Sequence, residues 1–547
     1  TLQMSQNAKT ANGLVKGLLN SSRAFVLGTA LLAGSMTMLS TTHAQAEKIL
    51  RVGNDGEPQS MDPHFISTVQ TSRLSDDMFL GLLTYGPDGE PVPGAAESWT
   101  VSDDGMTYTF KIRDHNWSDG VPVTAGDFVA GWNRLLDPAT GAEYASLLYI
   151  IEGAEAVNSG KEGAKLAATA LDDKTLQVKL TAPAPYFLAQ LTHQTAFPIP
   201  QHAIAKFGKD WVKPENIVVN GPYKLTEWLP NVHSKLEKNA EFYDAANVPI
   251  DEVIYYTYED RTAMQNRFRA GELDVARDIA SEQISWLRDN LADSLRIAPY
   301  AGIYYYAIRT DKDMFKDVRV RKALSMAINR EAITDSVLKT GELPAYSFVP
   351  PGTGNYGEPA YISWKDLSYN EKLEEAKKLL AEAGYGPDNP LKFTLRYNTS
   401  ENHKRIAIAA QNMWKQIGVQ AELFNTEGKI HYADLKVGNF EVARAGWIAD
   451  YNDAQNFLFL GEERTGPLNY AAFDNPRYNE LMLEAEKEGD LKKRASLMKQ
   501  AEAIMMEAQP YIPIYYYVSK QLVSPKIEGW IDNAPDRHLT RWLDIKE

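Results

Sequence analysis

An arginine and an aspartate lie six residues apart in the segment of residues 440–452, on either side of a Gly-Trp-Ile run. They are Arg444 and Asp450, and the run, Gly446-Trp447-Ile448, has the composition of a β-strand. A guanidinium binds carboxylates, a carboxylate binds ammonium groups, and the main chain of a strand pairs with any extended backbone. The segment therefore contains the groups that are needed to hold a short zwitterion by its backbone.

Strands and helices alternate along the rest of the chain and must position this segment. Alternating apolar residues around an Asp-Gly turn predict two strands within residues 99–112. Thr124, with an aspartate three residues on, predicts a capped helix start. Apolar residues at helical spacing predict a helix over residues 369–383, ended by Gly384. This interleaving favours the α/β class.

Composition and charge limit the functions that fit. The chain has 547 residues, 44% hydrophobic and 24% charged, which is ordinary for a globular protein. Its length allows two or three domains at about 150 residues each. The formal net charge of −15 argues against a nucleic-acid partner, which needs a basic patch. Cysteine is absent, so we expect no disulfide, no thiolate metal site and no acylated cysteine as a membrane anchor.

Residues 1–46 have the pattern of a cleavable signal peptide. Three basic residues and no acidic ones accompany an apolar run from Ala24 to about Leu39, and Ala44-Gln45-Ala46 precedes Glu47. A transmembrane anchor, the alternative, needs about 20 apolar residues, and glycines interrupt this shorter run. We therefore expect cleavage before Glu47 and export of the remaining chain.

The segment around Arg444 closely resembles the ligand-binding strand of the periplasmic oligopeptide-binding proteins, the solute-binding components of ABC peptide importers (extracytoplasmic solute-binding protein family 5). Further stretches resemble other landmarks of that family, in order: 56–63, 96–99, 117–132, 220–223, 269–274, 317–324 and 379–385. The resemblance implies an α/β, two-lobed periplasmic binding protein fold with a hinge and an extra inserted domain (cluster C type). The implied domains are lobe I (47–80, 200–302 and 519–547), inserted domain II (81–199) and lobe III (303–518).

The resemblance also implies how a peptide is held. Asp450 matches the aspartate that receives the peptide α-ammonium, and Gly446, Trp447 and Ile448 match main chain that pairs with the peptide as an added strand. Val69 matches a contact from the opposite lobe. Tyr144 and the tyrosines at 300 and 304–306 match positions near the family's ligand chamber. Consecutive strand residues alternate between faces, so not all of them can face it, and we expect Tyr144 and Tyr305 to do so.

The carboxylate end of the ligand has its own implied residues. His403 matches a histidine that reaches peptide C-termini, and Arg444 matches the arginine that serves shorter peptides. Leucines occupy two other basic positions of the family, and Lys339 and Lys436 follow one residue later as candidate carboxylate contacts. A one-residue shift on extended chain points a side chain to the other face, which leaves the ligand range open.

Several short segments match enzyme motifs, but the residues around them do not fit the enzymes concerned. Residues 352–357 satisfy G-x-G-x-x-G but follow two prolines and lead into Glu-Pro-Ala, so we interpret them as a loop. Two penicillin-binding-protein motifs, Ser336-x-x-Lys339 and Lys339-Thr340-Gly341, would share one lysine, whereas that chemistry needs two. The nine histidines do not fall at metal-ligand spacing. We therefore expect no catalysis, no cofactor and no metal.

The sequence thus predicts a periplasmic receptor of a Gram-negative bacterium that captures short peptides between two lobes. It would deliver them to an inner-membrane ABC permease with its ATPase subunits, as a monomer without a direct membrane anchor. One alternative is the same scaffold dedicated to a single ligand, such as a murein tripeptide, a dipeptide or an opine-like compound. More remote alternatives are a secreted hydrolase and a periplasmic holdase for unfolded segments.

Overall fold

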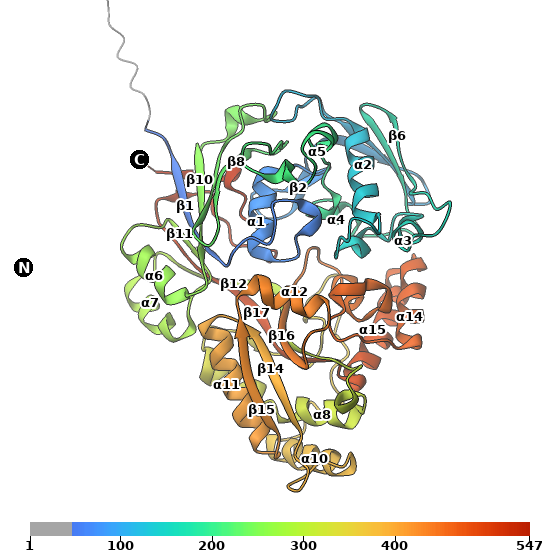
Figure 1. The fold of residues 1–547 in the computed structure, drawn as a ribbon, viewed down its shortest axis with the longest axis vertical. Coiled ribbons are helices and arrows are strands. Elements are labelled where there is room, and N and C mark those ends of the chain that lie inside the picture. The colour runs from blue at the N-terminus through green and yellow to red at the C-terminus, as the bar shows by residue number, and fades with distance from the viewer. Residues whose placement is uncertain (1–45, 547) are drawn as a thin grey trace, which may run out of the picture. The chain divides into compact units, whose positions relative to one another are not determined.

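The computed structural model describes residues 46–546 (Figure 1). The predicted signal peptide, apart from its last residue, lies outside the described residues. Within residues 46–546, no helix is both long and apolar enough to cross a membrane. The fold is mixed α/β, as the interleaved patterns predicted.

An 11-stranded mixed sheet is the largest element of the fold. Its strand order is β15-β14-β16-β12-β17-β11-β1-β10-β9-β8, with β13 paired beside β17. The strands are β1 (Ile49–Asp55), β8 (Tyr223–Leu229), β9 (His233–Lys238), β10 (Glu252–Tyr258), β11 (Val275–Arg277), β12 (Leu295–Ile308), β13 (Leu343–Pro344), β14 (Lys392–Asn398), β15 (Gln420–Thr426), β16 (Val442–Ile448) and β17 (Tyr511–Val523).

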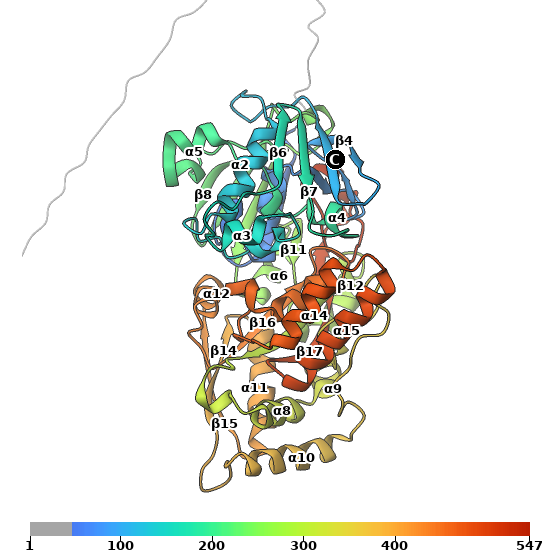
Figure 2. The ribbon, with the colours of Figure 1, turned by 90° about the vertical axis from the view of Figure 1, so that its right-hand side faces the viewer.

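Two long strands, β12 and β17, run through both halves of this sheet (Figures 1 and 2). Their antiparallel pairing is shifted between Pro299 and Ile303. Before the shift β17 continues into the half that contains β11 and β1, and after it β12 pairs with β16. The shift coincides with the predicted passage from lobe I to lobe III at residues 302 and 303. The domain boundaries themselves stay a prediction.

A separate antiparallel sheet of four strands, in the order β4-β5-β7-β6, is formed within residues 96–179. Its members are β4 (Ala96–Val101), β5 (Thr107–Ile112), β6 (Ala168–Asp172) and β7 (Thr175–Lys179), which confirms the predicted hairpin. The helix α2 (Ala125–Leu136) lies against it (Figure 2) and begins at the predicted Thr124 capping box. Two short pairs complete the strands: β2 (Leu83–Tyr85) with β3 (Pro91–Pro93), and β18 (Ile527–Glu528) with β19 (Asp544–Ile545).

Helices flank the sheets. Ser368 and Glu371 cap the start of α10 (Tyr369–Glu382), and Gly384, at φ +91°, follows its end, which confirms the predicted helix. Residues 352–357 lie in turns, as predicted. The other α-helices are α1 (Val69–Met78), α3 (Ala154–Asn158), α4 (Phe187–Gln190), α5 (Gln201–Phe207), α6 (Arg261–Arg269), α7 (Ile284–Asn290), α8 (Val318–Ala327), α9 (Arg330–Ala332), α11 (Glu401–Lys415), α12 (Gly428–Lys436), α13 (Gln455–Leu458), α14 (Pro476–Lys487) and α15 (Leu491–Ala508).

Candidate ligand-binding site

A large cavity lies between β16 and the start of α1. It contains about 1330 Å³ of space not filled by protein atoms, including its opening to solvent. Of the predicted site residues, its wall includes Val69, Tyr144, His403, Arg444, Gly446, Trp447, Ile448 and Asp450.

The carboxylate of Asp450 is buried at one side of this cavity. His193 approaches it with Nε2 at 3.3 Å, Asn456 donates from Nδ2 at 3.3 Å, and Tyr144 donates its hydroxyl proton. Burial raises the pKa of Asp450, but the His193 ring, the Tyr144 hydroxyl and the charge of Arg537 outweigh it, so the net shift is below the usual value. Within residues 46–546 no lysine or arginine nitrogen lies within 4 Å of this carboxylate. An ammonium group would supply the missing permanent charge.

The guanidinium of Arg444 is buried among neutral partners. Its Nη1 donates to Asn398 Oδ1 at 3.1 Å and to the Tyr432 hydroxyl at 3.0 Å, and its Nη2 donates to the Tyr517 hydroxyl at 2.6 Å. Its carbon lies 4.6 Å from the centre of the Tyr304 ring. Burial lowers the pKa of Arg444, yet the surrounding tyrosines raise it further, so the side chain stays charged. This cation is held in place but not neutralised.

The strand between these two charges has a free edge. On one side β16 pairs with β12, from Val442↔Ile308 to Ile448↔Gly302. On its other side the pairing with β14 ends at Ala443, so in the described chain no strand covers Gly446, Trp447 and Ile448 there. Backbone groups on that edge can pair with an extended ligand, as an added strand does. The residue at 446 must be small, because a Cβ there would collide with the Tyr517 hydroxyl.

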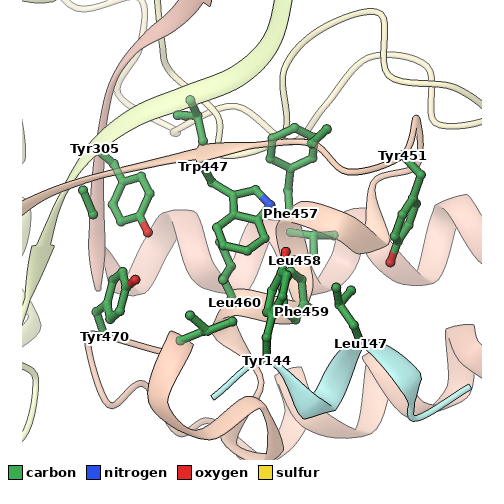
Figure 3. Packing of buried hydrophobic residues seen from close by; sticks show 14 of the residues in the cluster. Tyr144, Leu147, Tyr305, Trp447, Tyr451, Phe457, Leu458, Phe459, Leu460 and Tyr470 are labelled. Carbon is green, nitrogen blue, oxygen red and sulfur yellow. The ribbon is translucent and has the colours of Figure 1, made fainter. Parts of the chain in front are cut away.

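Trp447 lines the cavity and also packs against the buried residues around it. Its ring lies 5.6 Å from that of Tyr144 and 5.3 Å from that of Phe459, and its Nε1 donates to Asn456 Oδ1 at 3.3 Å (Figure 3). Only 6% of Trp447 is exposed. The indole therefore fixes Tyr144 and Asn456, two of the residues that contact the Asp450 carboxylate.

His403 reaches the cavity as a neutral ring. It lies on α11, is buried, and its Nδ1 is 3.3 Å from the Tyr304 hydroxyl. Burial, and then the charges of Arg444 and Arg261, hold the pKa of His403 well below the usual value. A ligand carboxylate at this position would meet a hydrogen-bonding group and not a second cation.

The family of the chain follows from comparison with known proteins. The sequence model described as "Bacterial extracellular solute-binding proteins, family 5 Middle" matches residues 90–466. The periplasmic oligopeptide-binding protein OppA of Escherichia coli (strain K12) is 40% identical over 529 residues, which cover 94% of this chain and 96% of that protein. The chain belongs to the family 5 bacterial extracellular solute-binding proteins.

Solved structures of family 5 members share the two-lobed fold. The crystal structure of Haemophilus influenzae OppA in complex with the peptide RPPGFSPFR matches with a TM-score of 0.90 at 37% identity, covering 92% of this chain and 100% of that one. The murein tripeptide-binding protein MppA of Escherichia coli matches with a TM-score of 0.89 at 36% identity, covering 92% and 99%. Its unliganded open form gives only 0.63. The lobes of the present structure are therefore not arranged as in that open form.

Several contacts beside the cavity of this family 5 protein join residues 143–186 to residues 436–464. Lys436 forms an ion pair with Glu143, and Arg464 Nη1 lies 2.9 Å from Glu155 Oε2. Tyr186 stacks on Tyr451 with ring centroids 5.0 Å apart. The contact of Tyr144 with Asp450 belongs to the same set, and both of these residues lie on the cavity wall.

Three predicted residues lie away from the cavity wall. Tyr305 is fully buried against Phe348 and Tyr511, while its neighbour Tyr304 faces Arg444. Lys339 is exposed, with φ +59°, after the π-helix of residues 333–338. Lys436 ends α12 and its ammonium is taken by Glu143.

Sequence reasoning missed several polar residues of this family 5 site. His193, which contacts Asp450, lies in no recognisable motif and precedes Asp450 by 257 residues in the sequence. The cavity wall also includes Arg73, Arg261 and Lys520, which come from three separated segments. Only the three-dimensional fold brings these charges together.

Proposed function

We propose that this protein is the substrate-binding component of a peptide ABC importer, which captures short peptides between its two lobes and passes them to an inner-membrane permease with its ATPase subunits. One observation carries the proposal. A buried carboxylate without a permanent cation, Asp450, and a buried guanidinium without an anion, Arg444, share a cavity and are joined by the free edge of β16. This arrangement complements an ammonium, a carboxylate and the backbone between them.

In this proposal Asp450 receives the peptide α-ammonium and Arg444 a carboxylate, with His403 as a neutral donor or acceptor beside it. Gly446, Trp447 and Ile448 pair with the peptide backbone. Val69, at the start of α1, contacts the ligand from the opposite side. The named relatives, OppA and MppA, are peptide-binding proteins and support this reading.

The proposal extends to location and chemistry. Export through the signal peptide would place a monomeric protein in the periplasm of a Gram-negative bacterium, where the named relatives from Escherichia coli reside. The protein would perform no catalysis, because its role ends with delivery of the ligand. The two lobes and the inserted domain would follow the predicted boundaries, with β12 and β17 as the hinge strands.

A receptor dedicated to one ligand is the second candidate. MppA, whose name specifies murein peptide, is 38% identical over 502 residues. In addition, leucines stand at two positions where the oligopeptide branch is expected to carry basic residues, and neither following lysine lines the cavity. Both observations allow a narrower ligand range than that of a general oligopeptide receptor.

Calorimetry can test the anchoring role. Protein that has been unfolded and refolded to remove bound ligand is titrated with a mixed set of free-amine tripeptides and with their N-acetylated forms. We expect acetylation or the substitution Asp450→Asn to weaken binding by about 2–5 kcal/mol, the range for removing one side of a buried charge pair. Asp103→Asn, at an exposed turn, is the matched control.

The outcomes separate the candidates. Equal binding of free and acetylated peptides would remove Asp450 as the anchor. If murein tripeptide, titrated separately, binds and the mixed tripeptides do not, the dedicated receptor is favoured. If cleaved peptide is found in the calorimeter sample after the titration, a receptor without catalysis is contradicted.

A further inference from the structure

Arg73 faces the cavity without an acidic partner. It lies on α1, one turn after Val69. Its Nη1 donates to Asn54 Oδ1 at 2.9 Å, and its Nε is buried with no acceptor. No carboxylate in residues 46–546 comes within 4 Å of its guanidinium nitrogens.

Other cations on the cavity wall are already paired. Arg261 contacts two aspartates, Asp55 at 2.8 Å and Asp278 at 2.6 Å. Arg537 lies 2.8 Å from Asp76, and Lys520 lies 2.5 Å from Glu342. Of the lysine and arginine side chains that line the described cavity, Arg444 and Arg73 remain without a carboxylate. They come from opposite sides of the cavity, Arg444 from β16 and Arg73 from α1.

The surroundings of Arg73 leave its charge only partly compensated. Burial lowers the pKa of Arg73 to about 10, and the nearby charge of Arg277 lowers it in the same direction. Asp536 and Asp55 act in the opposite direction but do not touch it. The Asp536 carboxylate is already held by Arg277 at 2.7 Å, by His538 at 2.8 Å and by Gln521 at 3.0 Å. Arg73 therefore stays charged at neutral pH and has free donors.

We propose that Arg73 forms a second anion subsite, which binds a ligand carboxylate from the side opposite Arg444 and so favours peptides with acidic side chains. The inference rests on the proposed function and narrows its ligand class. A carboxylate on Arg73 would satisfy the buried guanidinium by charge-assisted hydrogen bonds, which neutral side chains cannot match. The same chemistry fits a peptide α-carboxylate, and the experiment distinguishes the two sources.

The test uses matched tripeptides in calorimetry. Glu is placed at each of the three positions of an alanine tripeptide in turn, with the isosteric Gln peptide as partner, and every peptide is made with a free or an amidated C-terminus. All peptides are titrated into the wild type, Arg73→Gln and Arg73→Lys. Arg319→Gln, at a site with 42% of the side chain exposed, is the control. Thermal unfolding shows whether each variant is folded, and Arg73→Lys keeps the charge should Arg73→Gln fail to fold.

We expect the wild type to bind one Glu peptide about 10- to 100-fold more tightly than its Gln partner, as a hydrogen bond to a charged group allows. Arg73→Gln should abolish this preference, and Arg73→Lys should keep part of it. If Arg73→Gln loses the preference for a free over an amidated C-terminus but keeps the preference for Glu over Gln, the subsite binds the peptide α-carboxylate. If Arg73→Gln changes neither preference, the subsite is refuted while peptide binding stands. If no peptide binds to the wild type, the proposed function fails, and the subsite with it.

Discussion

The ion pair between Lys436 and Glu143 predicts that closure of the lobes contributes to ligand affinity. Lys436 ends α12 and Glu143 precedes Tyr144, so the pair bridges the two sides of the cavity. The Lys436 side chain is 6% exposed and that of Glu143 33%. Exposed pairs contribute about 0.2–1 kcal/mol, and breaking a buried pair costs about 3–5 kcal/mol. Because Glu143 keeps some contact with water, we expect a coupling energy of about 1–2 kcal/mol.

A double-mutant cycle measures this coupling. Peptide affinity is determined by calorimetry for the wild type, Lys436→Met, Glu143→Gln and the double variant. Each single variant should bind about 5- to 30-fold more weakly, because a less favourable closed form lowers the apparent affinity. The coupling should shrink between low and high salt. Lys378→Met, which breaks an exposed pair with Glu375 on α10, is the matched control and should bind like the wild type. Additive single effects, with a coupling below about 0.3 kcal/mol, would refute the role of this pair in closure.

Three further predictions concern the site and the fold. Gly446→Val should weaken peptide binding strongly, because the new side chain collides with the Tyr517 hydroxyl; calorimetry and thermal unfolding separate this from misfolding. Burial raises the pKa of Glu502 from 4.5 to about 7, so between these pH values the folded protein keeps a proton that the unfolded chain has lost. The free energy of unfolding should therefore fall as pH rises from about 4.5 to 7, by up to about 1.4 kcal/mol per pH unit. Urea unfolding at both pH values should show this decrease, and Glu502→Gln should remove it. Trp414→Ala should cost about 3–5 kcal/mol in the free energy of unfolding, because the fully buried indole also donates to Leu324 O at 3.0 Å; an unchanged urea midpoint would contradict this packing role.

Local patterns in the sequence predicted several elements of the fold, among them the strand that lines the cavity. The Gly-Trp-Ile run lies in β16, and Asp450 follows two residues after its end. The helix over residues 369–383 and the capped start at Thr124 were likewise predicted, because capping and hydrophobic periodicity depend on neighbouring residues alone. The free edge of β16 was not predictable in this way, since it depends on where the pairing with a distant strand, β14, ends.

The tyrosines at 304–306 show that a local pattern can predict the alternation of side chains along a strand but not which face each side chain is on. Strand alternation correctly predicted that adjacent tyrosines face opposite sides. It could not say which of the two faces turns towards the cavity. Tyr304 contacts Arg444 and His403, which line the cavity, whereas Tyr305 packs against Phe348 and Tyr511. The pairing of β12 with β17 is shifted between Tyr304 and Tyr305, and such irregularities are set by tertiary packing.

The two lysines, Lys339 and Lys436, lie away from the cavity wall for a different reason. On an extended chain, a shift by one residue turns the side chain to the opposite face. Lys436, however, is the last residue of α12, and Lys339 follows a π-helix. On an α-helix, with 3.6 residues per turn, one residue rotates the side chain by about 100° and not 180°. Lys436 therefore points to Glu143 at the lobe interface.

The charges that face the ligand show what a linear sequence cannot provide. Asp450 could be recognised beside its strand, but its partner His193 and the unpaired Arg73 lie in remote segments. The identity of those partners determines how the site works. Were Asp450 paired with an arginine, an incoming ammonium would have to displace a permanent cation from a buried anion, at a cost of several kcal/mol. A histidine ring, a tyrosine hydroxyl and an amide keep the carboxylate ionised and leave it able to bind an ammonium group. The same reasoning applies with opposite sign to Arg444, whose neutral hydroxyl and amide partners leave a cation ready for a carboxylate.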